Sequence, residues 1–110
     1  NGDMLAVWLN FVIMSAGRFQ NKVKKIIYLG ADHAGFEYKE KLKKYLSYLG
    51  YSYKDFGAYY FNPKDDYPDF GLKVAKQVAK QSNALGILLC GTGIGMCIIA
   101  NRIKRVRAAL

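Results

Sequence analysis

The chain has 110 residues, of which 52% are hydrophobic and 15% aromatic, so it forms one globular domain at most and is not a disordered segment. Its 17 Lys and Arg residues against 8 Asp and Glu residues give a formal net charge of +9. That charge suits an anionic partner such as nucleic acid, a membrane surface or a phosphorylated metabolite, and by itself it selects none of them.

The chain opens with an apolar run. Residues 4–14 read MLAVWLNFVIM, which is too short to cross a bilayer, because a spanning helix needs about 20 apolar residues. A secretory signal carries positive charge before such a run, whereas Asp3 is the only charge here. We therefore expect residues 1–22 to be an extension with no membrane role, followed by a domain that starts at residue 23.

The next segment alternates strand and helix patterns. The β-branched and apolar run IIYLG at 26–30 predicts a buried strand, and apolar residues at helical spacing over 38–49 predict a helix that ends at Gly50. Four lysines around this helix (39, 41, 43 and 44) are typical of a solvated helix face. Alternation over 51–56 predicts a second strand, and the Pro- and Asp-containing stretch 57–69 predicts a loop.

The second half repeats this order. An apolar face over 70–79 predicts a helix, and the continuous apolar run 85–90 predicts a central strand covered on both faces. A third apolar stripe over 96–103 predicts another helix, and residues 106–110 begin a fourth strand. The sequence therefore predicts an α/β fold, a three-layer α/β/α sandwich with a parallel Rossmann-like sheet that stops after the fourth strand.

Ligands of such sheets bind at the carboxyl ends of the strands, near the topological switch point. After the third predicted strand comes CGTGIG, in which glycines 91, 93 and 95 expose backbone N–H groups where a helix begins. This nest favours an anion, either a phosphate or an enediolate oxygen, although a plain tight strand-to-helix connection is the structural alternative. The dinucleotide fingerprint is not met, because the third glycine comes one residue early.

Cys90 directly precedes this nest. A helix N-terminus lowers the pKa of a thiol from about 8.5 towards neutrality, and a thiolate beside an oxyanion site can move a proton next to a carbonyl. The alternative is an ordinary buried cysteine. Cys97 is expected only to pack on its helix, and the spacing of the two cysteines favours a reduced, cytoplasmic pair over a metal site or a disulfide.

Asp32 and His33 follow the first predicted strand, and His33 is the only histidine. A histidine next to an acid in the same crevice can bind phosphate or assist the opening of a sugar ring. An ordinary capping or surface role is the alternative.

Three segments together resemble the ribose-5-phosphate isomerase B family, which includes the galactose-6-phosphate isomerase subunits. They read GADHAGFEYKEKL at 30–42, DYPDF at 66–70 and ILLCGTGIGM at 87–96, and the resemblance runs from about residue 25 to 110. It implies a sugar-phosphate isomerase domain over 23–110, without cofactor or metal, that works as a homodimer or homotetramer with shared sites. Nucleic acid and membrane are not implied partners.

Carried over residue by residue, the resemblance makes Cys90 the base that moves a proton between C1 and C2 through a cis-enediolate. Thr92 would assist opening of the furanose ring, and Asp32 and His33 would line the substrate site. The residues expected to hold the developing oxyanion are Gly91, Gly93, Ile94 and Gly95.

The resemblance favours ribose 5-phosphate and ribulose 5-phosphate as the substrate pair. The alternatives are a hexose 6-phosphate (galactose or allose) or an inactive truncated remnant.

This sequence departs from the family's pattern at a few positions. Ala31 stands where many members have Cys, Cys97 stands where many have Ser, and Arg102 and Arg105 make the segment after the third helix more basic than usual. Family members continue with another strand and a long helix that carry a second catalytic histidine and phosphate-binding arginines. A chain that truly ended at Leu110 is expected to be poorly stable, with little or no activity.

Overall fold

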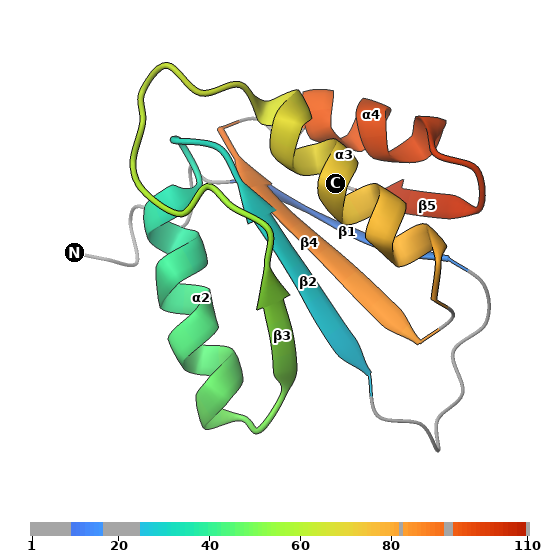
Figure 1. The fold of residues 1–110 in the computed structure, drawn as a ribbon, viewed down its shortest axis with the longest axis horizontal. Helices are drawn as coiled ribbons and strands as arrows, with labels where there is room; N and C mark the ends of the chain where they lie inside the picture. Colours follow the sequence, from blue (N-terminus) through green and yellow to red (C-terminus); the bar gives the residue numbers. More distant parts are fainter. Residues whose placement is uncertain (1–9, 17–24, 82, 92–93, 110) are drawn as a thin grey trace.

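The computed structural model describes residues 10–16, 25–81, 83–91 and 94–109. Strands and helices alternate along most of this sequence (Figure 1). In chain order the elements are β1 (Asn10–Ala16), β2 (Ile26–Ala31), α2 (Phe36–Tyr48), β3 (Ser52–Asp55), α3 (Tyr67–Ala79), β4 (Ala84–Cys90), α4 (Ile94–Arg102) and β5 (Val106–Ala109). Across these ranges no helix is long and apolar enough to span a membrane.

One sheet in the order β3-β2-β4-β1-β5 separates α2 from α3 and α4 (Figure 1). Side chains of β4 alternate between two apolar clusters, as the period of a strand requires. Leu88 belongs to the cluster that packs against α3 and α4, whereas Leu85 and Ile87 pack in the cluster under α2. The predicted three-layer α/β class is therefore confirmed.

The sheet is mixed, whereas the sequence analysis predicted a parallel one. β2 runs parallel to β3 and β4, but β1 is antiparallel to both β4 and β5 and lies between them. Along β1, Val12, Met14 and Ala16 are almost fully buried. Met14 pairs with Gly86, and a Cβ at that glycine would lie 2.6 Å from the Met14 Cγ, so the glycine makes room for this strand.

The helix ends follow local sequence signals. Gly50 has φ +84°, and the N–H of Tyr51 donates to the Leu46 carbonyl at 2.9 Å, so the predicted glycine cap ends α2. α3 begins at Tyr67, inside the stretch predicted as a loop to residue 69. Pro68 lies in the first turn of α3, where a missing N–H costs no helical hydrogen bond.

An ion network joins α2 to β3 and corrects the prediction that all four helix lysines are solvated. Lys39 is fully buried, and its Nζ donates to Asp55 and, at 3.0 Å, to Glu40. Lys43 contacts the same two carboxylates, at 2.9 Å from Asp55 Oδ2. Asp55 Oδ1 also accepts the Gly57 N–H at 2.8 Å, so the network holds the start of the next loop.

Burial would raise the pKa of Asp55, but the hydrogen bonds from Lys39 and Lys43 outweigh it and lower this pKa below its ordinary value. A lowered folded-state pKa stabilises the fold at neutral pH. This contribution is lost as the pH falls from the ordinary Asp value of about 3.9 through the lowered one.

Asp55→Ala is therefore expected to destabilise the fold by about 3 to 5 kcal/mol at pH 7, because it leaves the buried Lys39 ammonium with only the partly exposed Glu40. Lys39→Met is expected to cost clearly less, since Asp55 keeps Lys43 and the Gly57 N–H. Urea unfolding of the three proteins measures both differences. The gap between wild type and Asp55→Ala should shrink at acidic pH, and a gap independent of pH would contradict the charge-based explanation.

Candidate functional site

The segments that leave β2 and β4 lie side by side at the carboxyl edge of the sheet. The two strands are parallel neighbours with Ala31 opposite Leu89, and the chain then enters α2 on one face and α4 on the other. A Cβ on Gly35 would be closer than 3.0 Å to the Leu89 carbonyl group, and one on Gly91 would lie 3.8 Å from the Ala34 Cβ. This is a topological switch point, where α/β proteins bind ligands.

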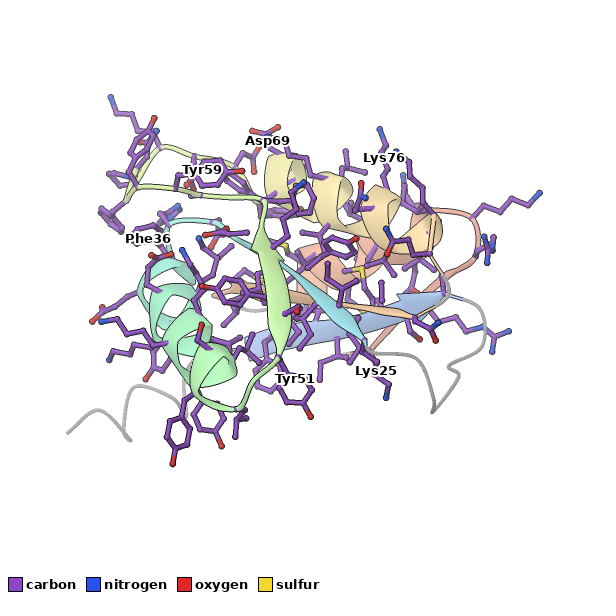
Figure 2. All side chains as sticks on the ribbon, turned by 60° about the horizontal axis from the view of Figure 1, so that its bottom comes forward. Lys25, Phe36, Tyr51, Tyr59, Asp69 and Lys76 are labelled. Carbon is purple, nitrogen blue, oxygen red and sulfur yellow. The ribbon has the colours of Figure 1, made fainter. Side chains whose placement is uncertain are left out.

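Figure 2 shows the two ends of the sheet. Phe36, in the first turn of α2, and Tyr59, in the loop after β3, lie at the site end, while Lys25 and Tyr51 precede β2 and β3 at the opposite end. Asp32 and His33 directly follow β2 and Cys90 ends β4, so these three residues belong to the site end of the sheet.

Asp32 organises the turn between β2 and α2. It is 7% exposed, and its Oδ1 accepts the N–H groups of Ala34 at 3.0 Å and Gly35 at 3.1 Å. Burial raises the pKa of Asp32, and the hydrogen bond from Gly35 opposes this rise without cancelling it. The carboxylate therefore shapes the loop that carries His33, in addition to its predicted place in the substrate site.

His33 is held by a residue that the sequence analysis did not select. Its backbone N–H and its ring Nδ1 each lie 2.9 Å from Oδ1 of Asp65, in the loop before α3. The ring of Phe61 meets the imidazole edge-to-face, with centroids 6.4 Å apart. A separation of 32 residues leaves no local sequence signal for the His33–Asp65 pair.

The hydrogen bond to the Asp65 carboxylate raises the pKa of His33, and burial opposes it only in part. The charge of Asp32 acts in the same direction as Asp65. A raised pKa keeps the imidazolium populated to higher pH, so this position favours an anionic ligand.

Cys90 is the last residue of β4 and is 5% exposed. It lies opposite Asn10 of β1 in the sheet register, and α4 begins four residues later at the exposed Ile94. The structure therefore places Cys90 between the end of β4 and the N-terminus of α4, as predicted, and its side chain belongs to the apolar cluster that packs against α3 and α4. Its role as a base stays a prediction. Thr92 and Gly93 lie outside the described residues.

Cys97 packs as expected, on the α4 face towards β5. It is partly buried, and its Sγ lies 3.5 Å from the Ala108 carbonyl oxygen. Neither Cys90 nor Cys97 is in a disulfide in the described part of the chain.

Tyr67 closes over Gly95, and the sequence analysis gave this tyrosine no role although it lies in the DYPDF segment. A Cβ on Gly95 would lie 2.6 Å from the Tyr67 hydroxyl oxygen and 2.5 Å from its Cζ. The first turn of α3 thus packs its aromatic ring on the first turn of α4. The glycine at 95 is required for this approach, which gives it a packing function as well as the predicted anion-binding one.

Gly95→Ala is expected to rotate Tyr67 away at a cost below about 1 kcal/mol, because the tyrosine is 36% exposed and the clash is with the end of its side chain. Urea unfolding measures the stability, and the NMR signals of the Tyr67 ring report its displacement. Tyr67→Leu, which removes the obstructing hydroxyl, should make the alanine tolerable without further shifts. A loss of several kcal/mol in Gly95→Ala would show that the tyrosine cannot move.

An apolar hollow of about 380 Å³ lies beside α2 and contains none of the predicted site residues. Its lining is mainly aromatic and aliphatic: Phe11, Tyr38, Lys41, Leu42, Tyr45, Ile87 and Leu89. A sugar phosphate needs polar partners, so this hollow does not compete with the carboxyl edge of β2 and β4 as the candidate site.

Comparison with known proteins gives one consistent result. A family model described as Ribose/Galactose Isomerase matches residues 27–110. Among curated proteins, the probable ribose-5-phosphate isomerase B of Mycoplasma genitalium is 45% identical over 85 residues, which are 76% of this chain and 56% of the relative. The galactose-6-phosphate isomerase subunit LacB of Clostridium acetobutylicum is 41% identical over 85 residues, 77% of this chain and 49% of the relative.

Solved structures are also similar. The Mycoplasma genitalium ribose-5-phosphate isomerase B with bound ribulose-5-phosphate matches with a TM-score of 0.69 at 40% identity, covering 73% of this chain and 53% of that one. The Trypanosoma brucei type B ribose 5-phosphate isomerase matches with a TM-score of 0.64 at 37% identity, covering 74% and 55%. The chain thus spans about half the length of the curated relatives it matches.

Proposed function

Because the chain belongs to the ribose/galactose isomerase family, we propose that it takes part in interconverting ribose 5-phosphate and ribulose 5-phosphate. The observation that carries this proposal is the close approach, at the switch point, of the loop that holds Asp32 and His33 to Leu89 and Gly91, the two neighbours of Cys90 in the sequence. A relative of the same fold has been solved with ribulose-5-phosphate bound, which supports a five-carbon sugar phosphate as ligand.

The proposed reaction uses this chain's own groups in two steps. The Cys90 thiolate removes the proton from C2 of the open aldose, and the C–H electron pair forms the C1–C2 double bond while O1 becomes the enediolate oxygen. The backbone N–H groups at the start of α4 stabilise that oxygen. Return of the proton to C1, with loss of the O2 proton and protonation of O1, gives the ketose.

His33 and Thr92 act before this proton transfer in the proposal. A cationic His33 binds the phosphate or donates a proton to the ring oxygen of the furanose. Thr92 assists that ring opening. The substrate is thereby held with C1 and C2 near the Cys90 thiol.

We also propose that the protein works as a homodimer or homotetramer. Tyr59, Tyr60 and Phe61 are 69%, 69% and 60% exposed in the loop that also carries Asp65, which supports a covered surface beside the site. Sedimentation velocity over a range of concentrations tests this, and a monomer at all of them would contradict it.

The function is tested by incubating the protein with ribose 5-phosphate, galactose 6-phosphate and allose 6-phosphate in D₂O. We expect ketose formation and deuterium incorporation with ribose 5-phosphate, at a kcat/KM at least about tenfold above either hexose, which corresponds to about 1.4 kcal/mol of discrimination. Preference for a hexose would favour the alternative substrate class. If ribose 5-phosphate shifts the amide NMR signals of Gly91 and Gly95 but is not converted, the chain is a binding remnant. The absence of both binding and turnover would overturn the proposal.

A further inference from the structure

Two loops far apart in the sequence are joined by a single carboxylate oxygen. Oδ1 of Asp65 lies 2.9 Å from the His33 backbone nitrogen and 2.9 Å from its ring Nδ1. The backbone N–H is always a donor. An ionised carboxylate oxygen can only accept, so the ring contact is a hydrogen bond when His33 carries a proton on Nδ1. Such a double contact fixes both the position of the main chain and the rotation of the ring.

Asp65 is an unusual residue to bury for stability alone. Its side chain is only 9% exposed, and among the described residues Oδ2 is buried without a hydrogen-bond partner. A buried, unpaired carboxylate oxygen is costly to a fold. Buried polar groups without a partner are rare in native proteins and call for an explanation. Here the explanation is that burying Asp65 brings its other oxygen, Oδ1, into contact with His33.

We propose that Asp65 is a positioning residue that holds His33 with Nδ1 as the inner donor and leaves Nε2 to contact the substrate. This rests on the proposed function, because it assigns His33 a ligand. Once Nδ1–H donates to Asp65, Nε2 is the remaining ring nitrogen for a phosphate or a furanose oxygen. The edge-to-face contact with Phe61 further limits rotation of the imidazole.

Electrostatics act in the same direction as the geometry. Two carboxylates influence the His33 ring, Asp65 from the loop before α3 and Asp32 from the loop after β2, and both raise the pKa of His33. The imidazolium form therefore persists to higher pH, and Nε2–H then donates to an anionic phosphate. This contribution to binding is lost as the pH rises through the pKa of His33.

The test begins with NMR titration, because His33 is the only histidine of the 110-residue chain and its ring signals are unambiguous. Long-range ¹H–¹⁵N spectra at high pH should show the Nδ1–H tautomer in the wild type. Asp65→Asn keeps an acceptor oxygen but removes the charge, so the pKa of His33 should fall while the tautomer is kept. Asp65→Val removes the acceptor as well, and the fixed tautomer should be lost.

Asp69→Asn is the matched control, because Asp69 is an exposed acid in the first turn of α3. This substitution removes the same charge at a residue that does not hold His33. Its His33 titration should equal that of the wild type. If Asp65→Asn and Asp69→Asn leave the pKa of His33 equally unchanged, or if the wild type lacks the Nδ1–H tautomer, the positioning role is overturned.

Binding of ribose 5-phosphate at neutral pH supplies the second readout. Asp65→Asn should raise the dissociation constant about tenfold, as expected for one lost charge-assisted hydrogen bond, and the pH at which binding weakens should move downward with the pKa of His33. Unchanged affinity in spite of a shifted His33 titration overturns the substrate-positioning role. A wild type that binds no ribose 5-phosphate overturns the proposed function instead, and the NMR comparison still decides whether Asp65 sets the ring.

Discussion

If Cys90 is the proposed base, replacing it with alanine is expected to lower the rate of the proposed isomerisation by about 10² to 10⁴-fold, the usual contribution of a general base. The thiol is the group at the end of β4 that lies before the N-terminus of α4, and alanine has no proton acceptor. The fold should survive, since only one sulfur atom is removed from a buried position. Deuterium exchange at C2 of ribose 5-phosphate measures the base directly and should fall with the rate.

Cys97→Ala supplies the matched control for this experiment. It removes the same atom from a partly buried cysteine that packs towards β5, and it should keep the wild-type rate. Cys90→Ser should also be strongly impaired, because a hydroxyl ionises far less readily than a thiol. Wild-type exchange in Cys90→Ala would show that another group removes the proton, and equal losses in both alanine variants would point to a structural effect.

Gly35→Ala is expected to destabilise the fold by about 3 kcal/mol or more, at the upper end of the range for overpacking. An added Cβ would overlap the Leu89 carbonyl group and lie 2.7 Å from the Leu89 Cβ. Leu89 is held in the sheet by its pairing with both β1 and β2, so neither backbone can yield easily. The start of α2 would have to move away from β4, which also separates His33 from Cys90.

This loss is a large share of the roughly 5 to 15 kcal/mol that stabilises an ordinary domain. The measurement is the midpoint of urea unfolding, with Gly91→Ala as the control. Gly91 belongs to the same edge, but its added Cβ would make only ordinary contact at 3.8 Å from the Ala34 Cβ. If the two variants unfolded at the same urea concentration, the close approach of α2 to β4 would be refuted.

The sequence alone was sufficient to predict those features of the fold whose signal lies in neighbouring residues. The apolar run of β4, the stripe of α2 and the cap at Gly50 each reflect a periodicity or a backbone conformation that neighbouring residues determine. The switch-point rule then placed the Asp32–His33 loop and Cys90 at the same edge, because parallel neighbouring strands end together.

Two features depended on contacts between distant segments. Strand β1 is apolar on both faces, so its own sequence does not show which face is buried. It becomes a strand of the sheet because it pairs with β4 on one side and β5 on the other, and because Gly86 leaves room for Met14. Lys39 has the same helical surroundings as its solvated neighbours, and it is buried because Asp55 of β3 faces it. No residue close in sequence to β1 or to Lys39 indicates these contacts, so the sequence pattern could not predict them.

By itself, the sequence determined the α/β class, the order of the elements from β2 onward and the loops on which the chemistry-bearing residues lie, because period and turn chemistry are local properties of the chain. Only the tertiary structure decided that Asp65 holds His33 and that Tyr67 covers Gly95. Those pairs are 32 and 28 residues apart, and contacts over such distances arise from packing the helices and loops onto one sheet edge.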